Sequence, residues 1–235
     1  MRTAKTILTV IQERGKQKKP IERVYKLLFN RELYLNAYAK LYPNNGAMTK
    51  GVTNETVDGM SIQKIDRMIE ILREEKYQWK PARREYIKKK NGKKRPLGIP
   101  VWGDKVLQEV MRQILEAYYE PQFSEHSHGF RPNRGCHTAL QEIQVWKGTR
   151  WFIEGDISQY FDTIDHKILL EILARNIHDG RFIRLVSNML EAGYLEEWKF
   201  KQTISGVPQG GVISPILANI SVSYTHLRAH ETDQY

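Results

Sequence analysis

Cysteine is almost absent from this sequence, and long apolar runs are absent altogether. The 235 residues include one cysteine, Cys136, which excludes an intramolecular disulfide framework and a cysteine-rich zinc site. We expect Cys136 to be a small buried or half-buried thiol. No apolar stretch approaches the roughly 20 residues that cross a membrane, and the basic N-terminus lacks the small-residue cleavage site of a signal peptide. These absences predict a protein of a reducing compartment such as the cytoplasm, with no membrane partner.

Histidine offers no clear metal site either. His126, His128 and His137 lie close together in the sequence, but no cysteine or histidine pair follows them at zinc-ligand spacing. Hydrophobic residues make up 40% of the chain and charged residues 27%, which is ordinary for a globular protein. The length is sufficient for one large domain or two small ones.

Positive charge is abundant and concentrated in one window. The formal charge of the chain is +10, and residues 80–95 hold nine basic residues against one acid, Glu85, which is a net +8. Such a field attracts polyphosphates in a salt-dependent way. Charge alone leaves a solvated basic loop as an equal alternative. The basic residues are Lys80, Arg83, Arg84, Lys88, Lys89, Lys90, Lys93, Lys94 and Arg95.

This basic window carries the signature of a β-hairpin. Residues 85–90 and 93–95 flank Asn91-Gly92, and Asn-Gly accepts the positive φ values of a type I′ turn. The pattern therefore predicts a projecting two-stranded basic arm.

Apolar spacing and cap residues predict the other elements. Apolar residues at helical spacing fill residues 21–42, and polar, glycine-punctuated sequence in residues 46–59 and 124–137 predicts loops. Alternation predicts a strand at residues 151–157 and an extended hairpin at residues 194–204. Helices are expected to begin or end at particular residues: Ser61, Asp104, Thr138, Asp165, Asp179 and, as a closing residue, Gly193. The sum is an α+β fold, with helices packed on a small, largely antiparallel sheet.

Four segments, in this order and spacing, point to a family. They are Arg95-Pro-Leu-Gly-Ile-Pro100, Gly129-Phe-Arg-Pro-Asn-Arg-Gly135, Glu154-Gly-Asp-Ile-Ser-Gln-Tyr-Phe-Asp162 and Ser205-Gly-Val-Pro-Gln-Gly-Gly-Val-Ile-Ser-Pro-Ile-Leu-Ala-Asn-Ile220. Each is weak alone, but together they closely resemble the successive blocks of group II intron reverse transcriptases, which also act as maturases. The resemblance covers about residues 20–220.

The resemblance implies a right-hand polymerase fold that consists of fingers and a partial palm. Its divisions are an N-terminal basic helical extension (1–60), fingers (61–150), a partial palm (151–220) and a tail that does not belong to the native protein (221–235). It also implies an RNA-directed DNA polymerase that uses an intron RNA template, a DNA primer or target, and deoxynucleoside triphosphates.

By the same resemblance, Asp156 is the first carboxylate of a two-ion Mg²⁺ site, and the backbone carbonyl of Ile157 faces the second ion. Hard Mg²⁺ prefers carboxylate oxygens, and two such ions clamp the attacking and leaving oxygens in nucleotidyl transfer. From spacing alone, an aspartate after a strand is more often a turn former or a helix cap.

Phe161 resembles the steric gate that leaves no room for a ribonucleotide 2′-hydroxyl. Without the motif, core packing beside Tyr160 is the default for this ring. We expect the neighbouring Asp162 and Asp165 to cap the following helix.

In the basic hairpin, Lys89 and Arg95 match the positions that grip the incoming triphosphate. Lys88 or Lys90 is an alternative to Lys89, because the register is uncertain by one residue. We assign Lys88, Lys93 and Lys94 to the template backbone.

The Pro208-Gln209-Gly210 turn resembles the one that places Gln209 over the nucleotide, with Gly210 allowing close backbone approach. Arg131 is assigned a contact with the template or the nucleotide pocket. A structural arginine packed on Phe130 is an equal alternative for Arg131.

The resemblance ends abruptly after Ile220. The Tyr-Ala-Asp-Asp tetrad that completes the metal site in this family is missing, and residues 221–235 fit no expected element. We therefore expect a truncated gene that ends in foreign sequence, an incomplete two-ion site and an inactive fragment.

Two alternative functions remain open at this stage. One is an RNA-binding splicing factor in which the polymerase residues are vestigial, served by basic N-terminal residues such as Arg14 and Lys16. The other is a reverse transcriptase of the retron, diversity-generating or CRISPR-associated kind.

Overall fold

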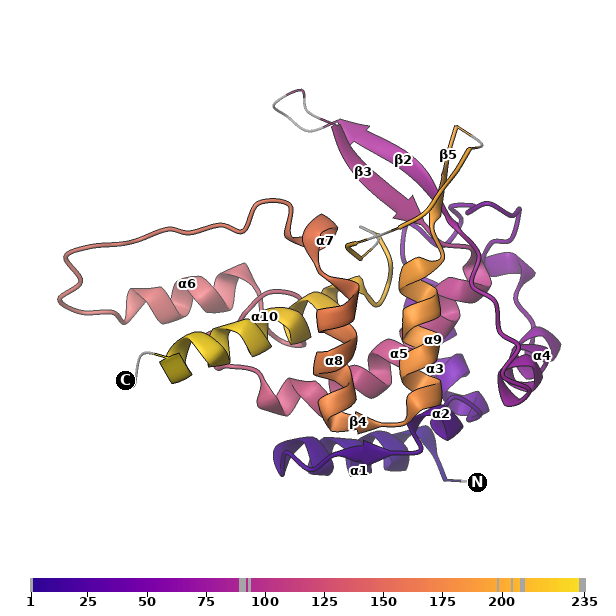
Figure 1. Ribbon diagram of the computed structural model, residues 1–235, viewed down its shortest axis with the longest axis horizontal. Helices are drawn as coiled ribbons and strands as arrows, with labels where there is room; N and C mark the ends of the chain where they lie inside the picture. The colour runs from indigo at the N-terminus through magenta and orange to yellow at the C-terminus, as the bar shows by residue number, and fades with distance from the viewer. Residues whose placement is uncertain are drawn as a thin grey trace.

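The computed structural model describes residues 2–232 except 89–91, 93, 198, 204, 208 and 209, and only the backbone of residues 225–232. The predicted α+β class is confirmed. Two hairpins stand together at one end of a body of helices (Figure 1). The principal helices are α1 Ala4–Lys16, α2 Val24–Leu27, α3 Arg31–Leu41, α4 Ile62–Arg73, α5 Trp102–Tyr119, α6 Cys136–Gln144, α7 Tyr160–Thr163, α8 His166–Asn176, α9 Gly180–Glu191 and α10 Ser214–Thr232, with short 3₁₀ turns at Val57–Gly59 and Glu120–Gln122.

Helix α5 is the centre of the core. It is buried along most of its length, and α1, α3 and α10 pack against it. Residues such as Leu107, Met111 and Ile114 of α5 are fully buried, because apolar residues three and four positions apart form a broad apolar face along the helix.

The predicted helix caps are confirmed at three helices. Ser61, Asp165 and Asp179 each accept a hydrogen bond from a backbone N–H in the first turn, at 3.2, 2.9 and 3.2 Å. Each cap satisfies a donor that the helix itself leaves unpaired. Gly193, with φ of +73°, follows the end of α9, as a left-handed closing glycine does.

The continuous helical pattern of residues 21–42 is broken in the structure. Strand β1 (Ile21–Glu22) pairs in parallel with β4 (Ile177–His178), and α2 and α3 follow as separate helices. Arg23 has a left-handed backbone with φ of +54°, and the Asn30 side chain caps α3 through the N–H of Glu32 at 2.9 Å. Local backbone and cap preferences outweigh the apolar spacing here.

The hairpin prediction is confirmed, and the sheet is mixed rather than antiparallel throughout. Strands β2 (Ala82–Lys88) and β3 (Lys94–Ile99) pair antiparallel. β2 also pairs in parallel with β5 (Tyr194–Glu196), which pairs antiparallel with β6 (Lys199–Lys201). Gly92 has the positive φ, +77°, that the predicted turn requires at this position, whereas Asn91 lies outside the described residues.

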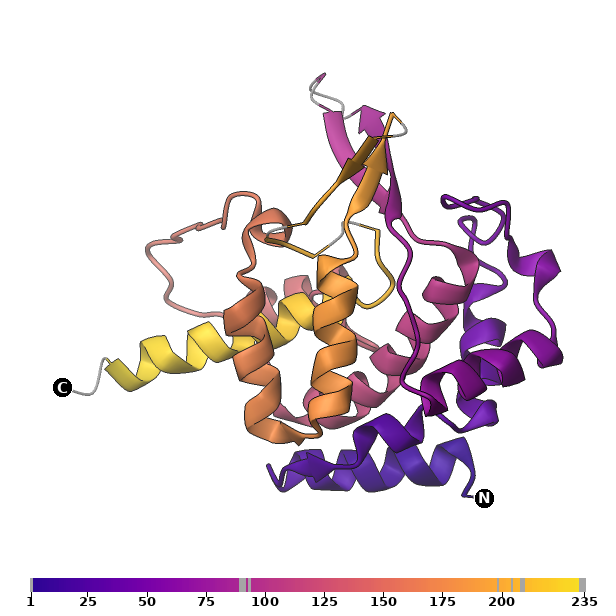
Figure 2. The same cartoon turned by 45° about the vertical axis from the view of Figure 1, so that its right-hand side comes forward.

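The strand predicted at residues 151–157 is wrong. This segment is irregular, and Trp151 and Ile153 are 87% and 94% exposed. Figures 1 and 2 show it as a single trace that loops away between α6 and α7. An alternating pattern forms a strand only where a neighbour accepts its backbone hydrogen bonds, and no strand of the described part of the chain runs beside it.

Two smaller expectations are also corrected. Cys136 is exposed rather than buried, because α6, which it begins, has no buried residue among those described. Residues 221–232, for which no element was expected, continue helix α10. Among the described helices none combines the length and the apolar character that crossing a membrane requires.

Candidate functional site

The loop of residues 205–212 connects three of the four sequence blocks. At its start, Val207 N–H donates to the backbone oxygen of Phe161 at 2.8 Å, and Gly206 N–H donates to that of Ile164 at 2.8 Å. At its end, Val212 N–H donates to Gln108 Oε1 of α5 at 2.9 Å. The loop is therefore held both to the Phe161 segment and to the central helix.

Gly210 brings the same loop against strand β3. Its φ is +105°, and a Cβ added at this position would lie 2.7 Å from the backbone oxygen of Gly98 and 2.7 Å from Leu97 Cδ1. Only glycine combines this backbone conformation with so close an approach. The segment that contains Arg95 is thus packed directly on the turn that contains Gly210.

Residues that the sequence analysis missed hold the walls of this region. Gln108 is buried and anchors the end of the loop. Lys105, also buried, donates its ammonium to the backbone oxygens of Gly46 and Thr49 at 3.1 and 3.0 Å, and burial followed by the charge of Arg83 lowers the pKa of Lys105. The sequence held no signal for either residue, because both fall among the polar positions of α5.

A polar cleft of about 320 Å³ opens between the sheet and the 205–207 turn. The Arg84 guanidinium lies over the ring of Tyr194 at 3.5 Å, and Arg84 lines the cleft together with Asp162 and Ser205. Ser205 Oγ donates to the backbone oxygen of Asp162 at 3.2 Å. The cleft therefore lies beside the Phe161 segment.

The predicted cations of the hairpin lie on both faces of its two strands. Lys88 is directly opposite Lys94, whereas Arg95 is opposite Ile87. Because successive side chains alternate between faces, Lys88 and Lys94 share the face of Arg84, and Arg95 occupies the other face. Lys89 and Lys93 lie outside the described residues.

Phe161 is half-buried beneath two other rings. Its centroid lies 6.2 Å from that of Tyr160 and 6.4 Å from that of Phe130, both edge to face. Phe130 is 70% exposed and has a left-handed backbone, with φ of +56°. The ring of Phe161 thus packs against the core beside Tyr160 and is also partly exposed. Gln209, its predicted neighbour, lies outside the described residues.

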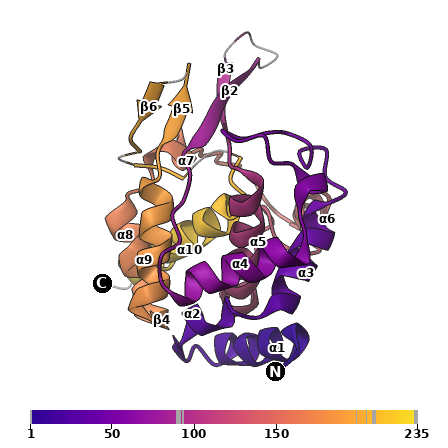
Figure 3. The same cartoon turned by 90° about the vertical axis from the view of Figure 1, so that its right-hand side faces the viewer.

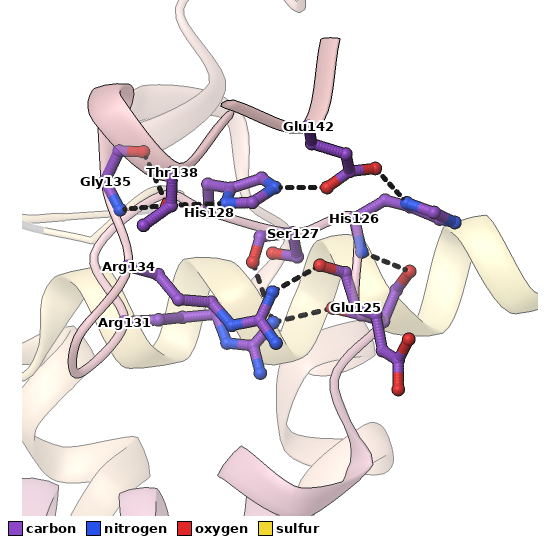
Figure 4. Close-up of polar contacts among 10 residues, drawn as sticks. Glu125, His126, Ser127, His128, Arg131, Arg134, Gly135, Thr138 and Glu142 are labelled. Carbon is purple, nitrogen blue, oxygen red and sulfur yellow. Dashed lines mark hydrogen bonds and ion pairs between the residues drawn. The ribbon is translucent and has the colours of Figure 1, made fainter. Parts of the chain in front are cut away.

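Arg131 is buried in a network of its own (Figure 4). Its guanidinium pairs with Glu120 at 2.9 Å and donates to the backbone oxygens of Ser124 and Ser127 at 2.6 and 2.7 Å. It lies 5.4 Å from the ring of Phe123 rather than on Phe130. With Nε, Nη1 and Nη2 all engaged by protein atoms, this arrangement favours the structural alternative for Arg131.

The clustered histidines hold a carboxylate. His128 Nε2 lies 2.8 Å from Glu142 Oε2, and His126 Nδ1 contacts the other oxygen. These hydrogen bonds, that of His128 first, lower the pKa of Glu142. His128 Nδ1 also contacts Thr138 Oγ1 at 2.8 Å. Figure 4 shows Glu142 of α6 between the two imidazoles, with a contact to each.

Asp156 and Ile157 are exposed in the irregular segment before α7. Within the described ranges, no group of three or more histidine, cysteine, aspartate or glutamate side chains is arranged to hold a metal ion. A two-ion site needs several carboxylate oxygens, so Asp156 and its described surroundings do not make up such a site.

Comparison with known proteins decides the family. The model of the family described as "Reverse transcriptase (RNA-dependent DNA polymerase)" matches residues 87–231. The chain belongs to the reverse transcriptase family.

The relatives of this reverse transcriptase chain include proteins encoded by introns, which confirms the group II intron type. It is 48% identical over 215 residues to the group II intron-encoded protein LtrA of Lactococcus lactis subsp. cremoris, covering 91% of this chain and 35% of LtrA. It is 45% identical over 240 residues to an uncharacterized 91 kDa protein in the cob intron of Schizosaccharomyces pombe, covering 99% of this chain and 29% of that protein. The chain thus spans about a third of these relatives.

A solved structure supports the fold. A partial Cas6-RT-Cas1–Cas2 complex superposes with a TM-score of 0.57 at 19% sequence identity, over 88% of this chain and 35% of that one. At this identity the likeness shows a shared reverse transcriptase-like fold and nothing of the partners.

Proposed function

We propose that the parent protein is an RNA-directed DNA polymerase of a group II intron, and that residues 61–150 and 151–220 are its fingers and part of its palm. In this division residues 1–60 are a basic extension. The observation that carries the proposal is the convergence of three sequence blocks on the 205–212 loop. That loop bonds to Phe161, packs on Gly98 and is anchored by Gln108.

In this proposal the pocket selects deoxynucleotides by exclusion. The half-buried ring of Phe161 stands against the sugar and leaves no room for a 2′-hydroxyl. Gly210 approaches β3 closely, and Gln209, which lies outside the described residues, is proposed to contact the sugar and base. The backbone oxygen of Phe161 accepts a hydrogen bond from Val207 N–H, which joins the segment that contains the ring to the start of the 205–212 loop.

The hairpin supplies positive charge to the nucleic acid. Lys88 and Lys94 face each other across the strands, and such like-charged pairs are destabilising unless an anion lies between them. A phosphate of the template backbone relieves this repulsion. Lys93, which lies outside the described residues, is proposed to contact the same template backbone. Arg95, on the other face, binds the triphosphate with Lys89.

Asp156 contributes one carboxylate to the metal site in this proposal. Further carboxylates come from parts of the parent protein outside this chain, since the described residues offer no such group. The 235-residue chain alone is accordingly expected to be inactive.

Primer extension tests the proposal. The contiguous gene is recovered, and its full-length product is assayed for Mg²⁺-dependent extension of a DNA primer on an RNA template. We expect extension that Asp156→Asn abolishes and Asp165→Asn leaves largely intact, because Asp165 caps α8 through Ile168 N–H. Extension that survives Asp156→Asn would contradict the assignment.

A splicing function is the second candidate. A relative named nuclear intron maturase 1, mitochondrial, of Arabidopsis thaliana is 36% identical over 93 residues, covering 39% of this chain and 13% of that protein. The exposed basic residues Arg14 and Lys16 at the end of α1 suit binding of intron RNA. Specific intron RNA binding by an intact parent that does not extend primers would favour this function.

A further inference from the structure

A second cleft lies away from the 205–212 loop, between α4 and the start of α5. Its volume is about 480 Å³, within the roughly 300–1,000 Å³ of small-molecule sites. Figure 3 shows α4 beside α5 and the chain rising from α4 to β2. The cleft therefore opens at the base of the basic hairpin, in a place that the proposed polymerase roles do not use.

The interior of this α4–α5 cleft is mainly apolar and includes two flat rings. Tyr77 and Trp102 line it together with Met60, Met68 and Ile71. Tyr77 is half-buried, whereas Trp102 is only 3% exposed. The Tyr77 hydroxyl donates to Asp104 Oδ1 at 2.6 Å, which fixes the ring. The indole N–H of Trp102 is buried and has no hydrogen-bond partner among the described residues. A fixed aromatic face beside flexible methionines accommodates a planar base.

The lining of the cleft carries four cations and two acids. Lys64 pairs with Glu55 at 3.8 Å, and Lys76 pairs with Glu74 outside the cleft at 3.0 Å. Arg67 and Lys80 form no ion pair within the described part of the chain. Both side chains are exposed, so they are available to an incoming anion.

We propose that the α4–α5 cleft binds one unstacked nucleotide of a single-stranded RNA, with its base against Tyr77 and a phosphate on Arg67 and Lys80. An acidic apolar peptide would suit the charge equally. RNA is favoured because the half-buried ring of Tyr77 offers a stacking face and because Lys80 begins the basic window that forms the hairpin. The strand therefore continues from the cleft along a positive surface.

Photo-crosslinking of the purified 235-residue chain tests this site. The probe is a short single-stranded RNA with one 4-thiouridine, and cross-linked peptides are mapped by mass spectrometry. We expect cross-links in the peptide that contains Tyr77. Arg67→Gln should weaken RNA binding roughly three- to tenfold and lower the salt slope by about 0.7, as for one lost phosphate contact. Lys80→Gln should act in the same direction.

The matched control is Arg73→Gln, which removes the same charge from the same helix. Arg73 lies over the ring of Phe29 at 5.6 Å and does not line the cleft, so cross-linking and affinity should stay near wild type. The inference rests on the nucleic-acid binding in the proposed function. The hairpin variant Lys88→Gln/Lys94→Gln distinguishes RNA binding by the hairpin from RNA binding by the cleft. RNA binding that depends on the hairpin but gives no cross-link in the cleft overturns this inference alone. No RNA binding at all overturns both.

Discussion

The helices packed around α5 and the arm of residues 136–157 are stabilised by different kinds of interaction. The α5 body buries its apolar residues almost completely. The 136–157 arm contains several large apolar side chains, yet Trp151, Phe152 and Ile153 are all more than two-thirds exposed. Apolar residues alone therefore do not produce packing in this chain. An apolar side chain is buried only where another helix or strand packs against the face that carries it.

The arm is held by polar contacts instead of packing. Glu142 of α6 contacts His126 and His128, and Thr138 contacts His128 and Gly135. Exposed polar contacts contribute little to stability, whereas burial of apolar area contributes strongly. Substitutions should accordingly have large effects in the body and small ones in the arm.

The largest effect is expected in α5. Leu107→Ala should lower the free energy of unfolding by about 2–5 kcal/mol, because it leaves a cavity in a fully buried position. Ile153→Ala in the arm should change it by no more than about 0.5 kcal/mol. Urea unfolding of both variants measures the contrast, and equal losses would remove the distinction between body and arm.

The free energy of unfolding should also depend on pH through Asp104, by an amount similar to the loss expected for Leu107→Ala. Burial, opposed by hydrogen bonds from Tyr77 and Lys80, raises the pKa of Asp104 from 3.8 to about 6. The folded state therefore holds this proton more tightly than the unfolded chain does. The resulting stabilisation is full below pH 3.8 and is lost as the pH rises to about 6, on the order of 3 kcal/mol. Unfolding measured across this range should show a flatter profile for Asp104→Asn than for wild type.

The next largest loss of stability is expected on substitution of Asp179, because its side chain joins two segments that are distant in the sequence. Its carboxylate accepts the N–H of Tyr25 at 2.9 Å and caps α9 through Arg181 N–H at 3.2 Å. Asp179→Ala should cost about 1–3 kcal/mol because two backbone donors lose their acceptor. Asp165→Ala, an exposed cap with one such bond, is the matched comparison in thermal unfolding and should cost less.

The smallest global effect is expected at Glu142. Glu142→Gln removes the charge that the two histidines hold and should speed amide hydrogen exchange in α6 with little change in the unfolding midpoint. A fall in the midpoint as large as that of Asp179→Ala would show that α6 belongs to the cooperative body.

The same contrast explains how far the sequence predicted the structure. Local signals were sufficient for the Asn-Gly hairpin and for the caps at Ser61, Asp165 and Asp179, because each depends on neighbouring residues alone. The strand at 151–157 failed because a strand requires a partner from elsewhere in the chain. The continuous helical pattern predicted for residues 21–42 failed at Arg23, because the local backbone conformation outweighed the apolar spacing.

For the candidate site, the motifs indicated which segments matter but not what supports them. They identified Phe161 and Gly210, whose segments the 205–212 loop brings together. Gln108 and Lys105 were missed, because a polar residue on the polar side of a helix does not reveal which distant backbone groups it will bind. Arg131 illustrates the converse: its motif suggested a ligand contact, and its buried network with Glu120 favours a structural role.

The most direct test of the account is nucleotide selection by Phe161 in the full-length parent protein. Incorporation of deoxyribonucleotides and ribonucleotides is compared for wild type and Phe161→Val under the same extension conditions. If the ring borders the sugar, ribonucleotide incorporation relative to deoxyribonucleotide should rise roughly tenfold or more. An unchanged ratio in a variant that still extends primers would contradict the placement of the nucleotide pocket beside Phe161 and the 205–212 loop.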